Sequence, residues 1–228
     1  GAKVFENTFA IDYKVHDSYV KVQTQNGTIK ADRVILACNG YLDNLEKRLT
    51  SKILPMNNYI VATKPLDDAT VQKINPRDIA FADSRFVINY FRLSADKRLL
   101  FGGGENYSKN LSKNIVPIVT RPLEKIYPFL KDIKIDYAWG GKLAITMNRL
   151  PFFTTLYNDK VISAQGYSGQ GVALASYSGK IVSEKITGNG ETFDIMSKVP
   201  RQSFPGGRFL RNPSMKIGML YYSLLDRI

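Results

Sequence analysis

The chain has 228 residues, of which 44% are hydrophobic and 11% aromatic, so it can bury one sizeable core or two small ones. It has neither a run of eighteen apolar residues nor a basic-then-apolar start, so we expect no membrane span, no export and a cytoplasmic location. One cysteine, Cys38, and one histidine, His16, exclude an internal disulfide, a cysteine-rich or histidine-based metal centre and a histidine triad. We therefore predict no metal, and chemistry that comes from a cofactor or from carboxylates, tyrosines and lysines.

The formal net charge of +12, from 32 Lys and Arg against 20 Asp and Glu, raises the question of an anionic partner. The basic residues are scattered singly among acids, and the densest stretch is 201–211, where three arginines lie near Phe204 and Phe209. We expect a solvated surface and no nucleic-acid partner. A non-catalytic module that binds a polyanion is the alternative, and salt-sensitive retention on nucleic acid would favour it.

The first forty residues predict strands. Residues 19–24 and 28–31 alternate apolar and polar positions around Asn26-Gly27, which predicts a β-hairpin. Residues 33–40 form a continuous apolar run that ends in a turn, which predicts a strand buried on both faces. Open α/β sheets bind ligands beyond the carboxyl ends of such strands.

Beyond Gly40 the pattern favours an antiparallel sheet. The expected strands are residues 58–63, two strands within 85–101 around the turn at 94–96, and residues 133–145. A helix is expected over 122–130. Four side chains on these strands are candidates for a pocket, namely Tyr59, Tyr90, Arg92 and Trp139. Aromatic residues on strands are more often core and a single arginine more often surface, so each also has a purely structural interpretation. Gly102-Gly103-Gly104 lacks the lysine of a phosphate-binding loop and predicts a bulge or loop.

The next segment has the outline of a ligand-binding unit. It consists of a strand over 160–164, a glycine-rich turn over 165–171 and a helix over 172–186 that Gly188 closes. Three glycines let the backbone approach a planar ligand, and the helix start stabilises negative charge by about 0.3–1 kcal/mol. A turn selected only for tight packing is the alternative. The remainder predicts an extended tail that ends in a short helix over 214–225.

Several segments, taken together and in this order, resemble the flavin-dependent D-amino-acid oxidase superfamily, and in particular its γ-glutamylputrescine oxidase branch. These segments are residues 5–8, 34–41, 89–96, 98–104, 139–141, 146–151, 165–172 and 204–208. The resemblance implies an α+β fold. An antiparallel substrate-binding sheet flanked by helices would span 41–145, the C-terminal part of a Rossmann-like FAD-binding domain would span 1–40 and 146–190, and 191–228 would be a tail.

The resemblance also implies FAD as cofactor and assigns the site. The residues expected near FAD are Ala10, Ala37, Cys38, Asn39, Gly40, Gly166, Tyr167, Ser168, Gly169, Gln170 and Gly171. In the implied reaction, hydride moves from the carbon next to an unprotonated amine to the flavin, and the imine then hydrolyses. Such chemistry needs no side-chain base, so Tyr59, Arg92 and Trp139 are expected to orient a small amine in the pocket.

The sequence departs from the family pattern at positions that concern the substrate. Leu143 and Gly169 stand where amino-acid-oxidising relatives place arginines for an α-carboxylate, so an amine or a γ-glutamyl amine is the expected electron donor. Thr154 replaces the usual glycine, and Gln170 replaces a frequent histidine.

The family's N-terminal G-x-G-x-x-G segment, which binds the pyrophosphate, is not found in these residues. The expectation is therefore a C-terminal portion that binds FAD weakly or not at all by itself. The missing N-terminal segment or a partner chain would supply the anchor, and a subunit of a hetero-oligomeric dehydrogenase is a further possibility.

Overall fold

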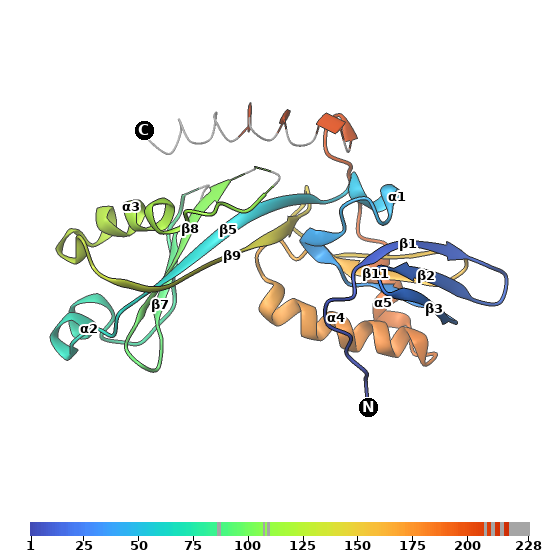
Figure 1. Cartoon of the computed structure of the whole chain (residues 1–228), viewed down its shortest axis with the longest axis horizontal. Coiled ribbons are helices and arrows are strands. Elements are labelled where there is room, and N and C mark those ends of the chain that lie inside the picture. Colours follow the sequence, from blue (N-terminus) through green and yellow to red (C-terminus); the bar gives the residue numbers. More distant parts are fainter. Residues whose placement is uncertain are drawn as a thin grey trace. The chain divides into compact units, whose positions relative to one another are not determined.

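A computed structural model describes residues 1–85, 88–106, 108, 110–207, 209–210, 213–214 and 217–218 (Figure 1). The chain divides into two compact units. The first combines Gly1–Pro55 with Leu143–Arg211, and the second is built on Met56–Lys142. No helix in the described part of the chain is both long and apolar enough to cross a bilayer.

The first unit is organised around a three-stranded sheet in the order β10 (Phe152–Leu156), β11 (Val161–Gln165), β4 (Val34–Leu36). β10 and β11 are antiparallel, whereas β11 and β4 are parallel, with Val161 opposite Val34. Successive side chains on a strand point to opposite faces, so this sheet has two apolar faces to cover.

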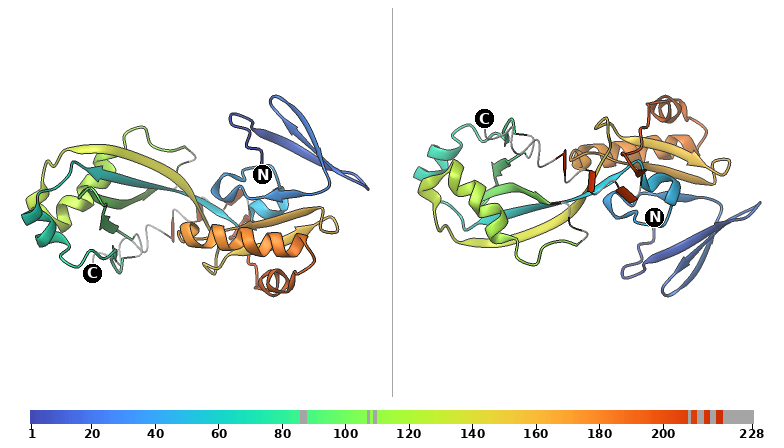
Figure 2. Two further views of the ribbon diagram at one scale, coloured as in Figure 1. Left: turned by 90° about the horizontal axis from the view of Figure 1, so that it is seen from below. Right: turned by 90° about the horizontal axis from the view of Figure 1, so that it is seen from above.

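Helices α4 (Gly171–Ile186) and α5 (Glu191–Ser197) cover one face (Figure 2). On this face Phe153 meets Phe193 edge to face at a centroid distance of 5.6 Å. The opposite face packs against η1 (Asn39–Tyr41), α1 (Lys47–Thr50) and the residues between and after them. The buried contributors on this side are Leu36, Leu42, Leu49, Ile53, Ala144, Phe152 and Val161.

The predicted hairpin is confirmed, because β2 (Val20–Thr24) and β3 (Gly27–Ala31) pair antiparallel. β1 (Ala10–Val15) joins them in a separate three-stranded sheet. The prediction of a strand buried on both faces within 33–40 is wrong. Leu36 is buried but its neighbour Ile35, which points to the opposite face, is 48% exposed, so only one face of β4 is covered among the described residues. β4 is also the edge strand of its sheet.

A buried carboxylate ties β1 to the start of α1. Glu46 accepts hydrogen bonds from the Tyr13 hydroxyl and from Arg48 Nε (3.0 Å), and the Arg48 guanidinium lies 4.3 Å from the centroid of the Tyr157 ring. Burial by itself would raise the pKa of Glu46, but the hydrogen bonds from Arg48 and Tyr13 outweigh it and lower the pKa from its ordinary 4.5 to about 2. The ionised form is therefore the one that the fold favours.

This network predicts a specific loss of stability in acid. Because the folded pKa of Glu46 is lowered, its contribution is fully present above pH 4.5 and is lost as the pH falls towards 2. We expect the free energy of unfolding to fall by about 2–3 kcal/mol more between pH 5 and pH 2 than in Glu46→Gln, which cannot titrate. Urea unfolding at several pH values measures this difference, and equal slopes for the two proteins would contradict it.

The second unit is a five-stranded sheet in the order β6 (Phe81–Ala82), β7 (Tyr90–Leu93), β8 (Leu99–Asn106), β5 (Leu54–Thr63), β9 (Ile135–Ile145). The registered pairs β7–β8 and β8–β5 are antiparallel, as predicted, and β6, which was not predicted, pairs antiparallel with β7. The helical segments of this unit are α2 (Asp68–Ile74), α3 (Val116–Ile126) and η2 (Pro128–Leu130).

The core of this unit lies between the sheet and α3. Phe101 stacks on Phe91 at 5.4 Å between ring centroids, and Val119 and Leu123 of α3 are completely buried with them. The helix begins earlier than the predicted 122–130, with a proline at the start of its first turn, where a missing N–H costs nothing.

Two predictions about the tail differ from the structure or fall outside it. α5 lies within the segment 191–228 that was expected to be extended, because Phe193 buries its ring against the sheet of the first unit. The helix predicted over 214–225 lies almost entirely outside the described residues.

Candidate functional site

The carboxyl ends of the parallel strands β4 and β11 meet a glycine-rich turn. Asn39, which follows β4, has a positive φ of 48°, and its Oδ1 accepts the N–H of Gly166 at 3.1 Å. One side chain therefore ties the two strand ends together. This edge is where open α/β sheets hold their ligands.

The turn over 166–171 has a backbone that favours glycine. Gly166, Ser168 and Gly169 all have positive φ, of 78°, 51° and 99°. A Cβ on Gly166 would lie 2.6 Å from Thr146 Cγ2, whereas a Cβ on Gly169 would meet nothing within 4 Å. The start of the turn is thus closely packed and its tip is open.

Ser168 fastens the middle of this turn. Its N–H donates to the carbonyl of Ala144 at 2.9 Å, and its Oγ accepts the N–H of Thr146 at 3.2 Å. Tyr167 is buried and donates its hydroxyl to the carbonyl of Ala164 at 3.0 Å. These bonds hold the backbone in position ahead of α4, so the turn is preorganised.

α4 begins without a side-chain cap. Gln170 is its N-cap residue and makes no capping hydrogen bond, and Val172 in the first turn is 99% exposed. The N–H groups of an uncapped helix start attract a negatively charged or electron-rich group. A ligand beside the turn would meet them directly.

Gln165, the last residue of β11, was not among the predicted site residues. Its side chain is completely buried, yet neither end of its amide has a hydrogen-bond partner among the described residues. An unsatisfied buried polar group costs about 1–3 kcal/mol. Such groups call for an explanation beyond packing. The signal in the sequence was a polar residue at the end of an apolar strand, directly before the glycines.

The structure gathers most of the predicted cofactor residues at this edge. Residues 37–40 follow β4 and residues 166–171 follow β11. Cys38 is partly buried, and burial raises the pKa of its thiol. Ala10 is placed elsewhere, in the separate β1–β3 sheet opposite Thr24.

The predicted pocket residues lie on the sheet of the second unit. Arg92 is exposed and Trp139 is 44% exposed. Tyr59 is different, because it is completely buried in the core under α3 and its hydroxyl accepts the N–H of Ser112 at 2.9 Å. Its expected place in the pocket is therefore corrected, since strand alternation puts it on the helix-covered face together with Val61.

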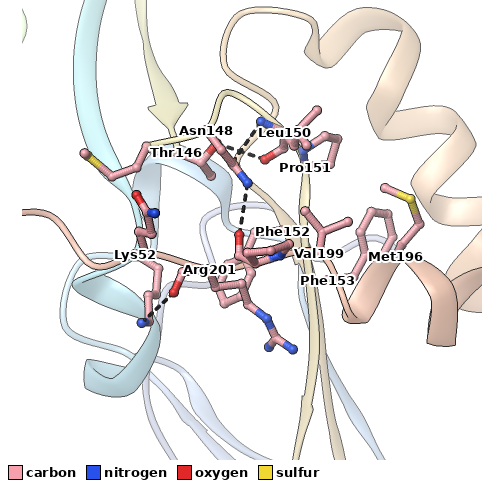
Figure 3. Close-up of a pocket in the computed structure, with 13 residues that line it drawn as sticks. Lys52, Thr146, Asn148, Leu150, Pro151, Phe152, Phe153, Met196, Val199 and Arg201 are labelled. Atoms are coloured by element: carbon pink, nitrogen blue, oxygen red, sulfur yellow. Dashed lines mark hydrogen bonds between the residues drawn. The ribbon is translucent and has the colours of Figure 1, made fainter.

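A small pocket in the first unit lies beside residues 146–153 (Figure 3). Asn148 Nδ2 donates to the carbonyl of Pro200 at 3.0 Å and Lys52 Nζ donates to the carbonyl of Arg201 at 3.1 Å. These two hydrogen bonds hold the chain segment at Pro200 and Arg201, which lines one side of the pocket. Arg201 also donates to Thr154 Oγ1 at 2.8 Å. The threonine that departs from the family pattern thus holds the segment after α5.

The parallel strand ends, the glycine-rich turn and the uncapped helix start form the kind of edge at which open α/β sheets hold a ligand, and a separate antiparallel sheet accompanies it. The chain belongs to the FAD-dependent oxidoreductase (DAO) family, whose model matches residues 1–185. FAD is the cofactor of this family.

Comparisons with individual proteins agree with this assignment. The chain is 39% identical over 227 residues to the probable oxidoreductase OrdL of Rhizobium meliloti and 35% identical over 229 residues to the gamma-glutamylputrescine oxidoreductase of Escherichia coli. These matches cover all of this chain and 52% and 53% of the two relatives, so the chain spans about half their length.

Among solved structures, the L-proline dehydrogenase of P. horikoshii is similar with a TM-score of 0.66 and 25% identity, over 88% of this chain and 53% of that one. The glycine oxidase of Bacillus cereus has the same fold at a TM-score of 0.67 and 19% identity, over 89% and 55% of the two chains.

Proposed function

We propose that this chain provides the flavin-ring side of an FAD site and the substrate-binding sheet of an enzyme that oxidises an amine to an imine. The observation that carries the proposal is the preorganised turn over 166–171, which joins two parallel strand ends to an uncapped helix. The electron acceptor would be FAD, which takes up a hydride from the carbon next to the amine nitrogen.

The residues at this edge fit a planar, electron-rich ring. The open tip at Gly169 allows close approach, and the start of α4 would stabilise the negative charge that a flavin gains on reduction. Gln165 carries a donor and an acceptor that none of the described residues satisfies. Residues 37–40 and 166–171 would hold the ring, with Asn39 keeping the two segments together.

An amine is the proposed substrate because the positions expected to grip an α-carboxylate carry no charge. Leu143 is an apolar residue of β9, and Gly169 leaves open space in its place. The name of the E. coli relative, gamma-glutamylputrescine oxidoreductase, supports the same class. Arg92 and Trp139 are the side chains that we propose to orient the amine and shape its pocket.

The anchor for the rest of FAD is proposed to come from outside these 228 residues, as a further segment or a partner chain. The edge of β4 supports this proposal, because an edge strand offers backbone groups for pairing with a further strand. Parallel sheets usually have both faces covered, yet Ile35 of β4 is half exposed. Pairing there would extend the sheet next to the glycine-rich turn.

Val172→Asp tests the flavin site. A carboxylate in the first turn of α4 favours the helix by about 0.3–1 kcal/mol, so the thermal unfolding midpoint should stay the same or rise. The same charge opposes an anionic ligand, so FAD affinity, measured by quenching of flavin fluorescence, should fall several-fold relative to the wild type and to the neutral control Val172→Asn.

The titration is made with the segment that anchors FAD supplied, and equal, measurable FAD affinity in all three proteins would exclude the turn from the flavin site. Loss of folding in Val172→Asp would be detected by the same thermal scans. If FAD binds, anaerobic addition of amines should bleach its visible absorption, and failure of every amine to do so would overturn amine oxidation while leaving the flavin site in place.

A further inference from the structure

The face of the second unit's sheet that α3 leaves uncovered carries a tyrosine and an asparagine in contact. Phe91 and Leu93 of β7 point into the core, so strand alternation puts Tyr90 on the opposite face. The Tyr90 hydroxyl donates to Asn58 Oδ1 at 2.5 Å. Tyr90 is partly exposed and Asn58 is 7% exposed, so the pair lies just below the surface.

Glycines on β8 make room for this pair. Gly102 is the cross-strand partner of Tyr90, and a Cβ there would lie 2.2 Å from carbons of the tyrosine ring, so the ring occupies the space that a side chain at position 102 would need. Further along, Gly104 has a φ of +65° where the register between β5 and β8 shifts, next to Asn58. Bulges of this kind re-aim side chains and occur beside active sites.

The Asn58 amide is hydrogen-bonded at only one of its two ends among the described residues. Its oxygen is used by Tyr90, but its buried Nδ2 has no hydrogen-bond partner among the residues that the structure describes. Asn75, a similarly buried asparagine of the same unit, uses both ends, with Nδ2 donating to the carbonyl of Ile79 at 2.7 Å and Oδ1 accepting its N–H at 3.0 Å. At Asn75 the described residues satisfy a buried amide fully, and at Asn58 they do not.

We propose that Asn58, positioned and polarised by Tyr90, is a specificity-determining residue that donates a hydrogen bond to an acceptor oxygen of the substrate, from an amide carbonyl or a carboxylate. This inference rests on the proposed function and adds that the enzyme recognises an oxygen of the substrate that is remote from the amine. Donation from Tyr90 to Oδ1 makes the Nδ2 hydrogens stronger donors, because linked hydrogen bonds polarise one another. A substrate lacking the oxygen would leave the donor unpaired, which is a strong basis for discrimination.

The first part of the test separates recognition from folding. Replacing both partners of a buried hydrogen bond by apolar groups of the same shape can be neutral or stabilising, so the variant Asn58→Leu/Tyr90→Phe should keep or raise the thermal unfolding midpoint. The control Asn75→Leu breaks two satisfied bonds and should lower it by several degrees. Asn58→Asp is a second variant that, when its carboxylate is ionised, still accepts from Tyr90 but offers no donor.

The second part measures binding without flavin, by ligand-observed NMR with three probes. N-acetylputrescine carries an amide carbonyl, 6-aminohexanoate carries a carboxylate, and heptylamine has neither. We expect the preference of the wild type for at least one oxygen-bearing probe over heptylamine to fall about tenfold or more in both Asn58 variants, in line with the loss of a buried hydrogen bond. Which oxygen-bearing probe binds better identifies the source of the acceptor.

An unchanged preference in the folded variants would overturn the inference, and so would a wild type that binds all three probes equally. Neither result depends on FAD. A failed flavin titration with an intact, Asn58-dependent preference would instead count against the proposed function alone.

Discussion

Gly166→Ala is expected to lower the free energy of unfolding by about 2–5 kcal/mol, which combines the strain of a non-glycine residue at positive φ with overpacking. The added methyl group would meet Thr146 Cγ2 at 2.6 Å. Thr146 cannot turn away freely, because its Oγ1 donates to the carbonyl of Leu150 at 2.8 Å and its N–H is bound to Ser168. The clash is therefore relieved only by moving the turn.

Gly169→Ala, in the same turn, is the matched control for this prediction. It has a positive φ of 99° but open space around the added methyl group, so only the strain of about 1–2 kcal/mol is expected. Chemical denaturation of both variants measures the two effects separately. If the variants lost equal stability, the close packing against Thr146 would not be what requires glycine at 166.

Tyr59→Ala is expected to destabilise the second unit by about 3–5 kcal/mol, as removal of a large aromatic side chain from a core does. The ring is completely buried with Val61 and Phe101 under α3, and its hydroxyl accepts a backbone N–H. Tyr59→Phe, which keeps the ring, should cost only about 1–3 kcal/mol for the unpaired N–H of Ser112.

Trp139→Ala provides the contrast, because Trp139 is exposed and was assigned to the same pocket from the sequence. It should change the free energy of unfolding by less than about 1 kcal/mol, as surface substitutions usually do. Thermal or urea unfolding of the three variants decides between the two positions. If Tyr59→Ala lowered the free energy of unfolding as little as Trp139→Ala, the predicted place of Tyr59 in the pocket would be supported instead.

Glycines are required for different structural reasons in the two units. In the first unit, the positive φ of Gly166 and Gly169 shapes a turn at the end of parallel strands. In the second, Gly102 has no special φ and serves only to let a ring approach the backbone.

Local patterns in the sequence determined the hairpin of the first forty residues, the strands of the antiparallel sheet and the strand, turn and helix around residues 160–186. Each of these signals lies within a few residues of chain, where periodicity and glycine positions act directly. The family also followed from the sequence, because many short segments matched in order.

The tertiary structure decided what depends on pairing between distant segments. The edge position of β4, the burial of Tyr59 and the contact between Tyr90 and Asn58 all follow from strand order and register, and a shift by one residue exchanges the faces of a strand. The same holds for Gln165, whose unpartnered amide is visible only once its neighbours are in place. The sequence thus determined the elements and the family, whereas long-range packing determined which side chains are left to meet a ligand.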